Sequence, residues 1–145
     1  MAQREPSLIL LVDDDLVHRS LIRSILEEVV AERPYVLADA EDGGEALDLL
    51  DRLLPRHGRI LMLTDQSMPG RTGLETIREA RRRHPTAEVH YVLWSSVRPE
   101  RLRCDPPEGP DEVAEKPIGL EAFMHLVAGF VERWETVQTP QAAHG

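Results

Sequence analysis

The chain contains almost no cysteine and no long apolar run. Cys104 is its only cysteine, so the sequence offers neither an internal disulfide nor a cysteine-based metal cluster. No apolar run approaches the ~20 residues that a membrane-spanning helix needs, and the opening Met-Ala-Gln-Arg-Glu-Pro-Ser lacks the apolar core of a signal peptide. These absences lead us to expect a protein of the reducing cytoplasm that has no contact with a membrane.

Basic residues are also in short supply. The chain has 17 Lys and Arg against 26 Asp and Glu, a net charge of −9. Binding to nucleic acid needs a basic face, so we expect no direct contact with nucleic acid. The histidines show no pair at metal-ligand spacing and are predicted to be surface or loop residues. They are His18, His57, His84, His90, His125 and His144.

Short apolar runs alternate with amphipathic stretches along the 145 residues. The runs predict strands at Leu8–Val12, Tyr35–Ala38, Ile60–Thr64, Val89–Trp94 and, more weakly, Val113–Ala114. Apolar residues at helical spacing predict helices from about Leu16 to Ala31, Gly44 to Leu54, Leu74 to Arg83 and Leu120 to Val137. This alternation is typical of an α/β fold with parallel strands, and the length suits one domain with a full core.

The pattern weakens between residues 97 and 110, which are rich in proline and glycine. A helix there can be short at best, over Pro99–Cys104, because the pair Pro106–Pro107 blocks its continuation. We therefore expect an N-terminal extension over residues 1–7, one domain over 8–137 and a flexible tail over 138–145.

Acidic residues follow two of the predicted strands at the points where those strands end. Asp13 and Asp14 come directly after the first run, and Asp65 ends the third. The carboxyl ends of the strands are where ligands bind in open α/β sheets. Carboxylates suit Mg²⁺, and a carboxylate beside Mg²⁺ can act as a nucleophile towards phosphorus. Taken singly, each of these acids could instead cap a helix or shape a turn.

Two further polar residues complete the predicted pocket. Ser95 ends the fourth run, where its hydroxyl can donate to a phosphoryl oxygen. Lys116, followed by Pro117, can place its ammonium on another such oxygen. Alone, each has an ordinary alternative as a polar strand end or a solvated lysine. Asp15 is interpreted more simply, as a cap of the first helix.

Together these residues resemble the receiver domain of two-component response regulators. The matching motifs, in order, are Asp13–Asp14, Asp65, the loop Met68–Gly73, Ser95 and Lys116–Pro117, and the resemblance covers about residues 7–135. It implies a flavodoxin-like, doubly wound, five-stranded parallel sheet in the order 2-1-3-4-5. It also implies a single-domain response regulator that receives a phosphoryl group on Asp65 from a sensor histidine kinase and signals through protein contacts.

The resemblance assigns roles to individual residues as well. Asp14, Asp65 and the carbonyl of Ser67 would hold Mg²⁺, and Asp13 would act largely through water. The chemistry falls to Asp65, Lys116 and Ser95, with Ser95 moving to the phosphoryl group after transfer. We expect self-phosphorylation and self-dephosphorylation only, and no enzymatic turnover of an external substrate.

The sequence departs from the family pattern in ways that affect its output. Val113 occupies the position of the usual aromatic switch residue, three before the lysine, and the fourth helix is degenerate. We expect no output domain, and the ending Phe130–Pro140 is similar to the extended tails of dimeric response regulators paired with bacterial phytochromes. Val131, Trp134 and Val137 extend the apolar stripe, so we expect a homodimer through the last helix. The alternative is that these side chains pack onto the chain's own core.

Two other functions remain open at this stage. Asp13-x-Asp15 after an apolar strand resembles the entry motif of haloacid-dehalogenase-type phosphatases, which also need an acidic motif on a strand after the lysine. The second is a receiver that is never phosphorylated and serves only as an interaction module, a reading suggested by Val113 and the degenerate fourth helix.

Overall fold

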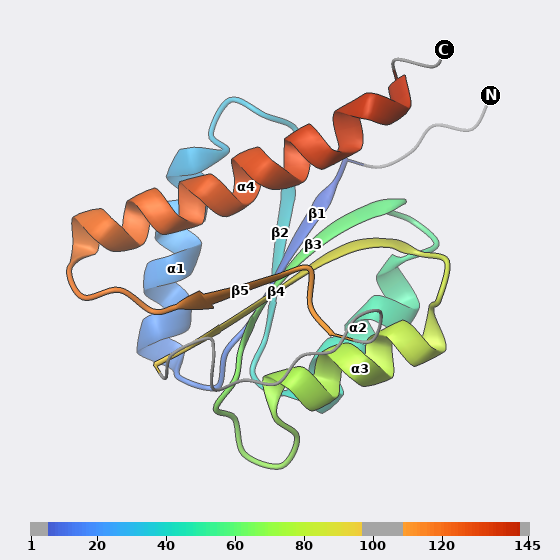
Figure 1. Ribbon diagram of the computed structural model, residues 1–145, viewed down its shortest axis with the longest axis horizontal. Coiled ribbons are helices and arrows are strands. Elements are labelled where there is room, and N and C mark those ends of the chain that lie inside the picture. Colours follow the sequence, from blue (N-terminus) through green and yellow to red (C-terminus); the bar gives the residue numbers. More distant parts are fainter. Residues whose placement is uncertain (1–5, 97–108, 143–145) are drawn as a thin grey trace.

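A computed structural model describes residues 6–96 and 109–142 of the chain. The elements are β1 (Leu8–Val12), α1 (Leu16–Val29), β2 (Val36–Ala40), α2 (Gly43–Leu53), β3 (Arg59–Asp65), α3 (Gly73–Arg83), β4 (Glu88–Ser95), β5 (Glu112–Glu115) and α4 (Leu120–Ala142). The strands form one five-stranded sheet in the order β2-β1-β3-β4-β5, and every pairing is parallel. The predicted fold class and strand order are therefore confirmed (Figure 1).

Helices cover both faces of the sheet, which explains the unbroken apolar sequences of its central strands. All of β1 and most of β3 are buried. One face, which includes Ile9 and Leu61, packs against α1 and α4. The opposite face, which includes Leu8 and Ile60, packs against α2 and α3 (Figure 1). Neighbouring residues of one strand thus enter different cores, as the alternation of side chains along a strand requires.

The predicted elements lie close to the observed ones, with differences at their ends. The weak fifth strand exists and runs over Glu112–Glu115, at the edge of the sheet beside β4. The first helix ends at Val29, before the predicted Ala31, because the backbone of Val30 leaves the helical conformation. The short helix predicted over Pro99–Cys104 lies outside the described residues.

The last helix corrects the sequence-based argument for a dimer. α4 continues to Ala142, past the predicted end at Val137. Val131 and Trp134 are fully buried in the chain's own core, and the Trp134 ring lies 5.3 Å from that of Tyr35. These two side chains form no exposed patch, so the prediction of a dimer interface at Trp134 was wrong. The homodimer itself stays a prediction without that support.

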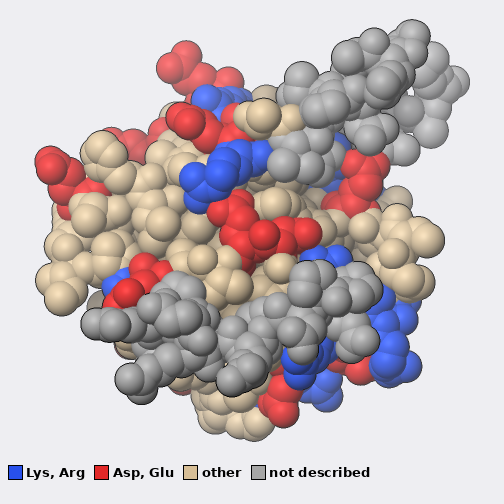
Figure 2. Space-filling view, viewed as in Figure 1, with Lys and Arg blue, Asp and Glu red and all other residues tan. Residues whose placement is uncertain are grey.

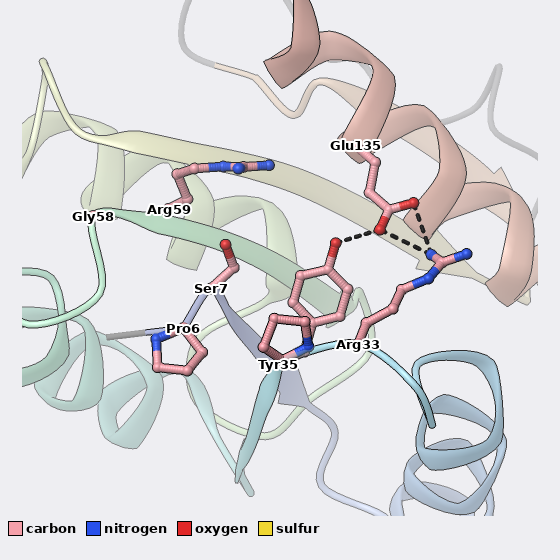
Figure 3. A pocket seen from close by; sticks show the side chains of 8 residues that line it. Pro6, Ser7, Arg33, Tyr35, Gly58, Arg59 and Glu135 are labelled. Atoms are coloured by element: carbon pink, nitrogen blue, oxygen red, sulfur yellow. Dashed lines mark hydrogen bonds and ion pairs between the residues drawn. The ribbon is translucent and has the colours of Figure 1, made fainter. Parts of the chain in front are cut away.

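A cluster of polar contacts holds the far end of α4 against the sheet. The Arg33 guanidinium lies 2.7 Å from a carboxylate oxygen of Glu135 in α4, and the Tyr35 hydroxyl also donates to Glu135 (Figure 3). These residues line a cavity of about 440 Å³ together with Ser7 and Arg59. The cavity lies at the amino ends of the strands, opposite the edge where the acidic motifs end.

Basic side chains gather near the end of α3, with acidic side chains among them. Figure 2 shows blue side chains together in the region where Figure 1 draws α3, whose last turn contains Arg81, Arg82 and Arg83. Each is paired with an acid: Arg81 with Asp111, Arg82 with Glu79 and Arg83 with both Glu79 and Asp51. The local excess of arginine is thus largely offset by neighbouring carboxylates. Within the described part of the chain, no helix combines the length and apolarity needed to cross a membrane.

Candidate functional site

The polar residues singled out by the sequence meet at the carboxyl edge of the sheet. Asp13 and Asp14 follow β1, and Asp65 ends β3. Each can offer a carboxylate oxygen such that the three oxygens lie within 4.8 Å of one another. Ser95 ends β4, and its carbonyl accepts a hydrogen bond of 2.8 Å from the backbone N–H of Lys116, just after β5. Parallel strands bring these four segments to one edge, although they are far apart in the sequence.

Lys116 provides the positive charge of this edge. Its ammonium nitrogen lies 3.0 Å from Oδ1 of Asp65 and 5.9 Å from the centre of the Trp94 ring. Both side chains of the Lys116–Asp65 pair are largely shielded from water. A shielded ion pair attracts more strongly than an exposed one, so Lys116 is well placed to stabilise negative charge that develops at Asp65.

Opposing effects act on the pKa of the Asp65 carboxyl group. Burial raises its pKa above the ordinary value, and the nearby charge of Asp13 raises it further. Lys116 and a hydrogen bond from the backbone N–H of Ser67 work in the opposite direction. Because like charges are gathered here at a cost, a bound cation would relieve repulsion that Lys116 alone does not remove.

The donor atoms of the cluster fit a divalent cation such as Mg²⁺. Asp13 and Asp65 are buried and Asp14 is exposed, so the cluster is open to water on one side. Mg²⁺ takes oxygen ligands, keeps several waters and is usually bound through one or two carboxylates. The fit supports the predicted set Asp13, Asp14 and Asp65, while the role of the Ser67 carbonyl stays a prediction.

The loop after Asp65 is fixed by hydrogen bonds at the start of α3. The backbone N–H of Gly73 donates to the carbonyl of Gln66, and Thr72 with Glu75 forms a reciprocal capping box at the start of α3. Gly73 leaves no room for a side chain, because a Cβ there would lie 2.3 Å from the backbone oxygen of Asp65. The glycine thus lets the loop pass directly against the backbone of Asp65.

Asp15 and His18 show where the sequence analysis succeeded and where it failed. Asp15 caps α1 by accepting from the backbone N–H groups of Val17 and His18, as predicted. His18 was predicted to be a surface or loop residue; its side chain is 23% exposed, but the prediction missed its contact with the acidic cluster. Its Nδ1 lies 2.5 Å from Oδ2 of the buried Asp13. The spacing of five residues carries no motif, so the contact depends on how α1 is rotated against the strand end.

The comparisons with known proteins agree with this geometry. The family model described as "Response regulator receiver domain" matches residues 9–128. The chain belongs to the response regulator receiver family. The receiver is also 38% identical over 125 residues to the transcriptional regulatory protein CpxR of Escherichia coli, covering 86% of this chain and 49% of CpxR. The chain thus spans about half the length of that curated relative.

Solved structures confirm the receiver fold. The Mn²⁺-bound response regulator Rcp1 superposes with a TM-score of 0.71 at 21% identity, covering 89% of this chain and 94% of Rcp1. The phosphorylated cyanobacterial phytochrome response regulator RcpA gives a TM-score of 0.71 at 22% identity, covering 91% of this chain and 96% of RcpA. At these identities the likeness shows the fold alone, so pairing with a phytochrome stays an expectation.

The family assignment also bears on the rival functions. A haloacid-dehalogenase-type phosphatase would need a strand with an acidic motif after Lys116, whereas residues 120–142 form α4. The described residues after Lys116 therefore do not contain the strand that such a phosphatase needs. Val113, in the place of the aromatic switch residue, lies in β5 opposite Leu93.

Proposed function

We propose that this receiver accepts a phosphoryl group on Asp65 from a phosphohistidine of a sensor histidine kinase. A carboxylate oxygen of Asp65 attacks the phosphorus in line, and the phosphorus–nitrogen bond of the phosphohistidine breaks. The bonding electrons go to the imidazole nitrogen, and Asp65 becomes an acyl phosphate. The observation that carries the proposal is the ion pair between Lys116 and Asp65 at 3.0 Å, beside the carboxylates of Asp13 and Asp14.

The surrounding residues support this transfer by positioning and charge. Lys116 can follow the negative charge from the carboxylate to the phosphoryl oxygens with a small movement of its ammonium group. Ser95, buried at the end of the neighbouring strand, supplies a hydroxyl that can donate to the same group. A divalent cation held by Asp13, Asp14, Asp65 and the Ser67 carbonyl would add positive charge next to the transferring oxygens. Rcp1, whose solved form holds Mn²⁺, has the same fold.

A partner kinase needs a surface beside the pocket, and exposed apolar side chains provide one. Val17 in the first turn of α1 is 79% exposed, and Ile118 between β5 and α4 is 98% exposed. The two segments are neighbours, because the ring of His18 in α1 lies 5.3 Å from that of Phe123 in α4. Apolar groups left in water around a polar pocket mark a contact site. The exposed large apolar side chains of these two segments are Leu16, Val17, Leu21, Ile118 and Leu120.

The proposal extends to the kind of kinase and to the kind of output. A bacterial phytochrome is one kind of kinase that fits, since RcpA is a phytochrome response regulator of the same fold. The signal would leave through protein contacts rather than through a DNA-binding surface, in line with the net charge of −9.

The test is to incubate the purified protein with Mg²⁺ and acetyl phosphate and to measure its intact mass. We expect one added phosphoryl group in the wild type and none in Asp65→Asn, which keeps the size of the side chain but loses its nucleophilic carboxylate. Lys116→Ala should slow labelling strongly, by about 10²-fold or more, as for other groups that stabilise transition-state charge. Asp48→Asn, at an exposed position of α2, is the matched control and should label normally.

The alternative of an interaction module that is never phosphorylated makes the opposite prediction. Val113 in the place of an aromatic switch residue is the observation that favours it. In that case the folded wild type would bind its partner equally well with and without acetyl phosphate and would gain no mass.

A further inference from the structure

His18 of α1 also contacts the acidic cluster, through the carboxylate of Asp13. Its Nδ1 lies 2.5 Å from Oδ2 of Asp13, whose side chain is only 1% exposed. A carboxylate can only accept a hydrogen bond, so Nδ1 must be the ring nitrogen that carries the proton. His18 therefore donates to a buried carboxylate whose charge would otherwise be poorly solvated.

The orientation of the His18 ring is fixed by packing. The ring meets Phe123 of α4 edge-on, with centroids 5.3 Å apart and planes at 87°, and lies 6.2 Å from the centroid of Trp94. Both aromatic side chains belong to the buried core. A ring held in this way cannot turn away from Asp13 without disturbing the contact between α1 and α4.

The other groups around Asp13 are fixed as well. The backbone N–H of Asp15 donates to Oδ1 at 2.9 Å, so each carboxylate oxygen of Asp13 has its own donor. The guanidinium of Arg19 donates to the backbone carbonyl of Asp13 at 2.6 Å. Backbone and side chain of Asp13 are thus held before any cation arrives, although Asp65 repels the carboxylate.

We propose that His18 is a positioning residue that holds the carboxylate of Asp13 in the orientation used for the divalent cation. The inference rests on the proposed function, since it concerns the same pocket. Each carboxylate oxygen keeps a second lone pair for a metal ion or its water after accepting one hydrogen bond. Outer hydrogen bonds of this kind orient metal ligands, and their loss weakens metal binding.

The test compares Mg²⁺ affinity by calorimetry in the wild type, His18→Leu, His18→Asn and His125→Leu. His18→Leu should bind Mg²⁺ about tenfold more weakly, in the range found for other outer partners of metal ligands. His18→Asn should recover most of the affinity, because its amide nitrogen can take the place of Nδ1. His125 is exposed on α4, so His125→Leu should match the wild type. Equal or tighter binding by folded His18→Leu would overturn the inference.

A second measurement needs no variant. Nitrogen-15 NMR of the wild type at neutral pH should show the proton of His18 on Nδ1, while a proton on Nε2 with a bare Nδ1 would overturn the inference. Failure here is distinguishable from failure of the proposed function. If the wild type binds Mg²⁺ and is labelled on Asp65 while His18→Leu has unchanged affinity, only the role of His18 is refuted. If the wild type binds no Mg²⁺ and gains no phosphoryl group, the proposed function fails with it.

Discussion

At the residue scale, Gly73 sets how closely the loop after β3 can pack against Asp65. A Cβ at Gly73 would lie 2.3 Å from the backbone oxygen of Asp65 and 2.7 Å from Cδ1 of Leu93. Gly73→Ala should therefore shift the backbone at Asp65, destabilise the fold by about 1–3 kcal/mol as other overpacked sites do, and slow labelling by acetyl phosphate. Chemical denaturation and the labelling rate measure the two effects.

Gly44→Ala is the control for that substitution. The nearest atom to a Cβ at Gly44 is a carboxylate oxygen of Asp42 at 3.4 Å, which is ordinary contact. Because alanine favours a helix over glycine by up to ~1 kcal/mol, Gly44→Ala should leave stability unchanged or slightly raised. A Gly73→Ala protein as stable and as readily labelled as Gly44→Ala would contradict the packing described for the loop.

The two tyrosines of the chain supply a pH-dependent test. Burial raises the pKa of Tyr35 to about 12, helped by its hydrogen bond to Glu135, and burial likewise raises the pKa of Tyr91 to about 12. Both values exceed the ordinary 10.0. Since these pKa values are raised in the folded state, the stability that depends on the protonated tyrosines is fully present below pH 10 and is lost as the pH rises towards about 12.

Ultraviolet titration of phenolate measures this directly. The native protein should show little phenolate at pH 10.5, whereas the protein unfolded in guanidinium should be more than half ionised there. Tyr35→Phe should remove about half of the signal change. A native midpoint near pH 10 would show that Tyr35 and Tyr91 are not held as described.

At the residue scale, the sequence predicted which side chains lie together wherever polar residues and strand ends coincide. Asp13, Asp14 and Asp65 lie together as expected, because an acid directly after a buried strand lies at the edge of a parallel sheet. Lys116, which was placed there through its resemblance to the Lys-Pro motif of receivers, lies 3.0 Å from Asp65. His18 was missed because its contact with Asp13 comes from a helix and depends on packing against Phe123. The spacing of residues along one strand or one helix does not show which side chains of different elements meet.

Among the elements, α4 carries the strongest test of packing. Trp134 is fully buried, with its ring 5.3 Å from Tyr35 and 5.5 Å from the guanidinium carbon of Arg59. Trp134→Ala should cost about 3–5 kcal/mol of folding free energy, as for other large-to-small changes in a core. The control Ile118→Ala, at a side chain 98% exposed, should stay within about 0.5 kcal/mol of the wild type. Denaturant titration measures the free energy of unfolding of both variants. A small decrease in that free energy for Trp134→Ala would contradict the burial of Trp134 and favour the dimer interface predicted from the sequence.

The strands and helices were predictable because apolar residues are spaced differently in the two kinds of element. The buried strands appear as continuous apolar runs, and the helices show one apolar stripe each. What the sequence did not supply was how far the sheet extends beneath α4. Tyr35 and Arg59 continue the core at the amino ends of β2 and β3, so Val131 and Trp134 find cover that a helix considered alone does not reveal.

For the whole molecule, we expect a bound divalent cation to stabilise the fold. Mg²⁺ at tenfold excess over its Kd should add about 1.4 kcal/mol by mass action. Asp14→Ala should lose this response, and its stability without Mg²⁺ should equal or exceed that of the wild type, because one like charge has been removed from the cluster. Thermal unfolding with and without Mg²⁺ measures both quantities. An Asp14→Ala protein that still responds fully to Mg²⁺ would remove Asp14 from the predicted ligand set.

Locating the phosphoryl group in the wild-type protein is the most direct test of Asp65 as the phosphoacceptor at the converging strand ends. After incubation with Mg²⁺ and acetyl phosphate, the acyl phosphate can be trapped with borohydride and its position found by mass spectrometry of the resulting peptides. We expect a single modified residue, Asp65, in the peptide that includes the end of β3. Modification at another residue, or none in a protein that is folded and binds Mg²⁺, would contradict it.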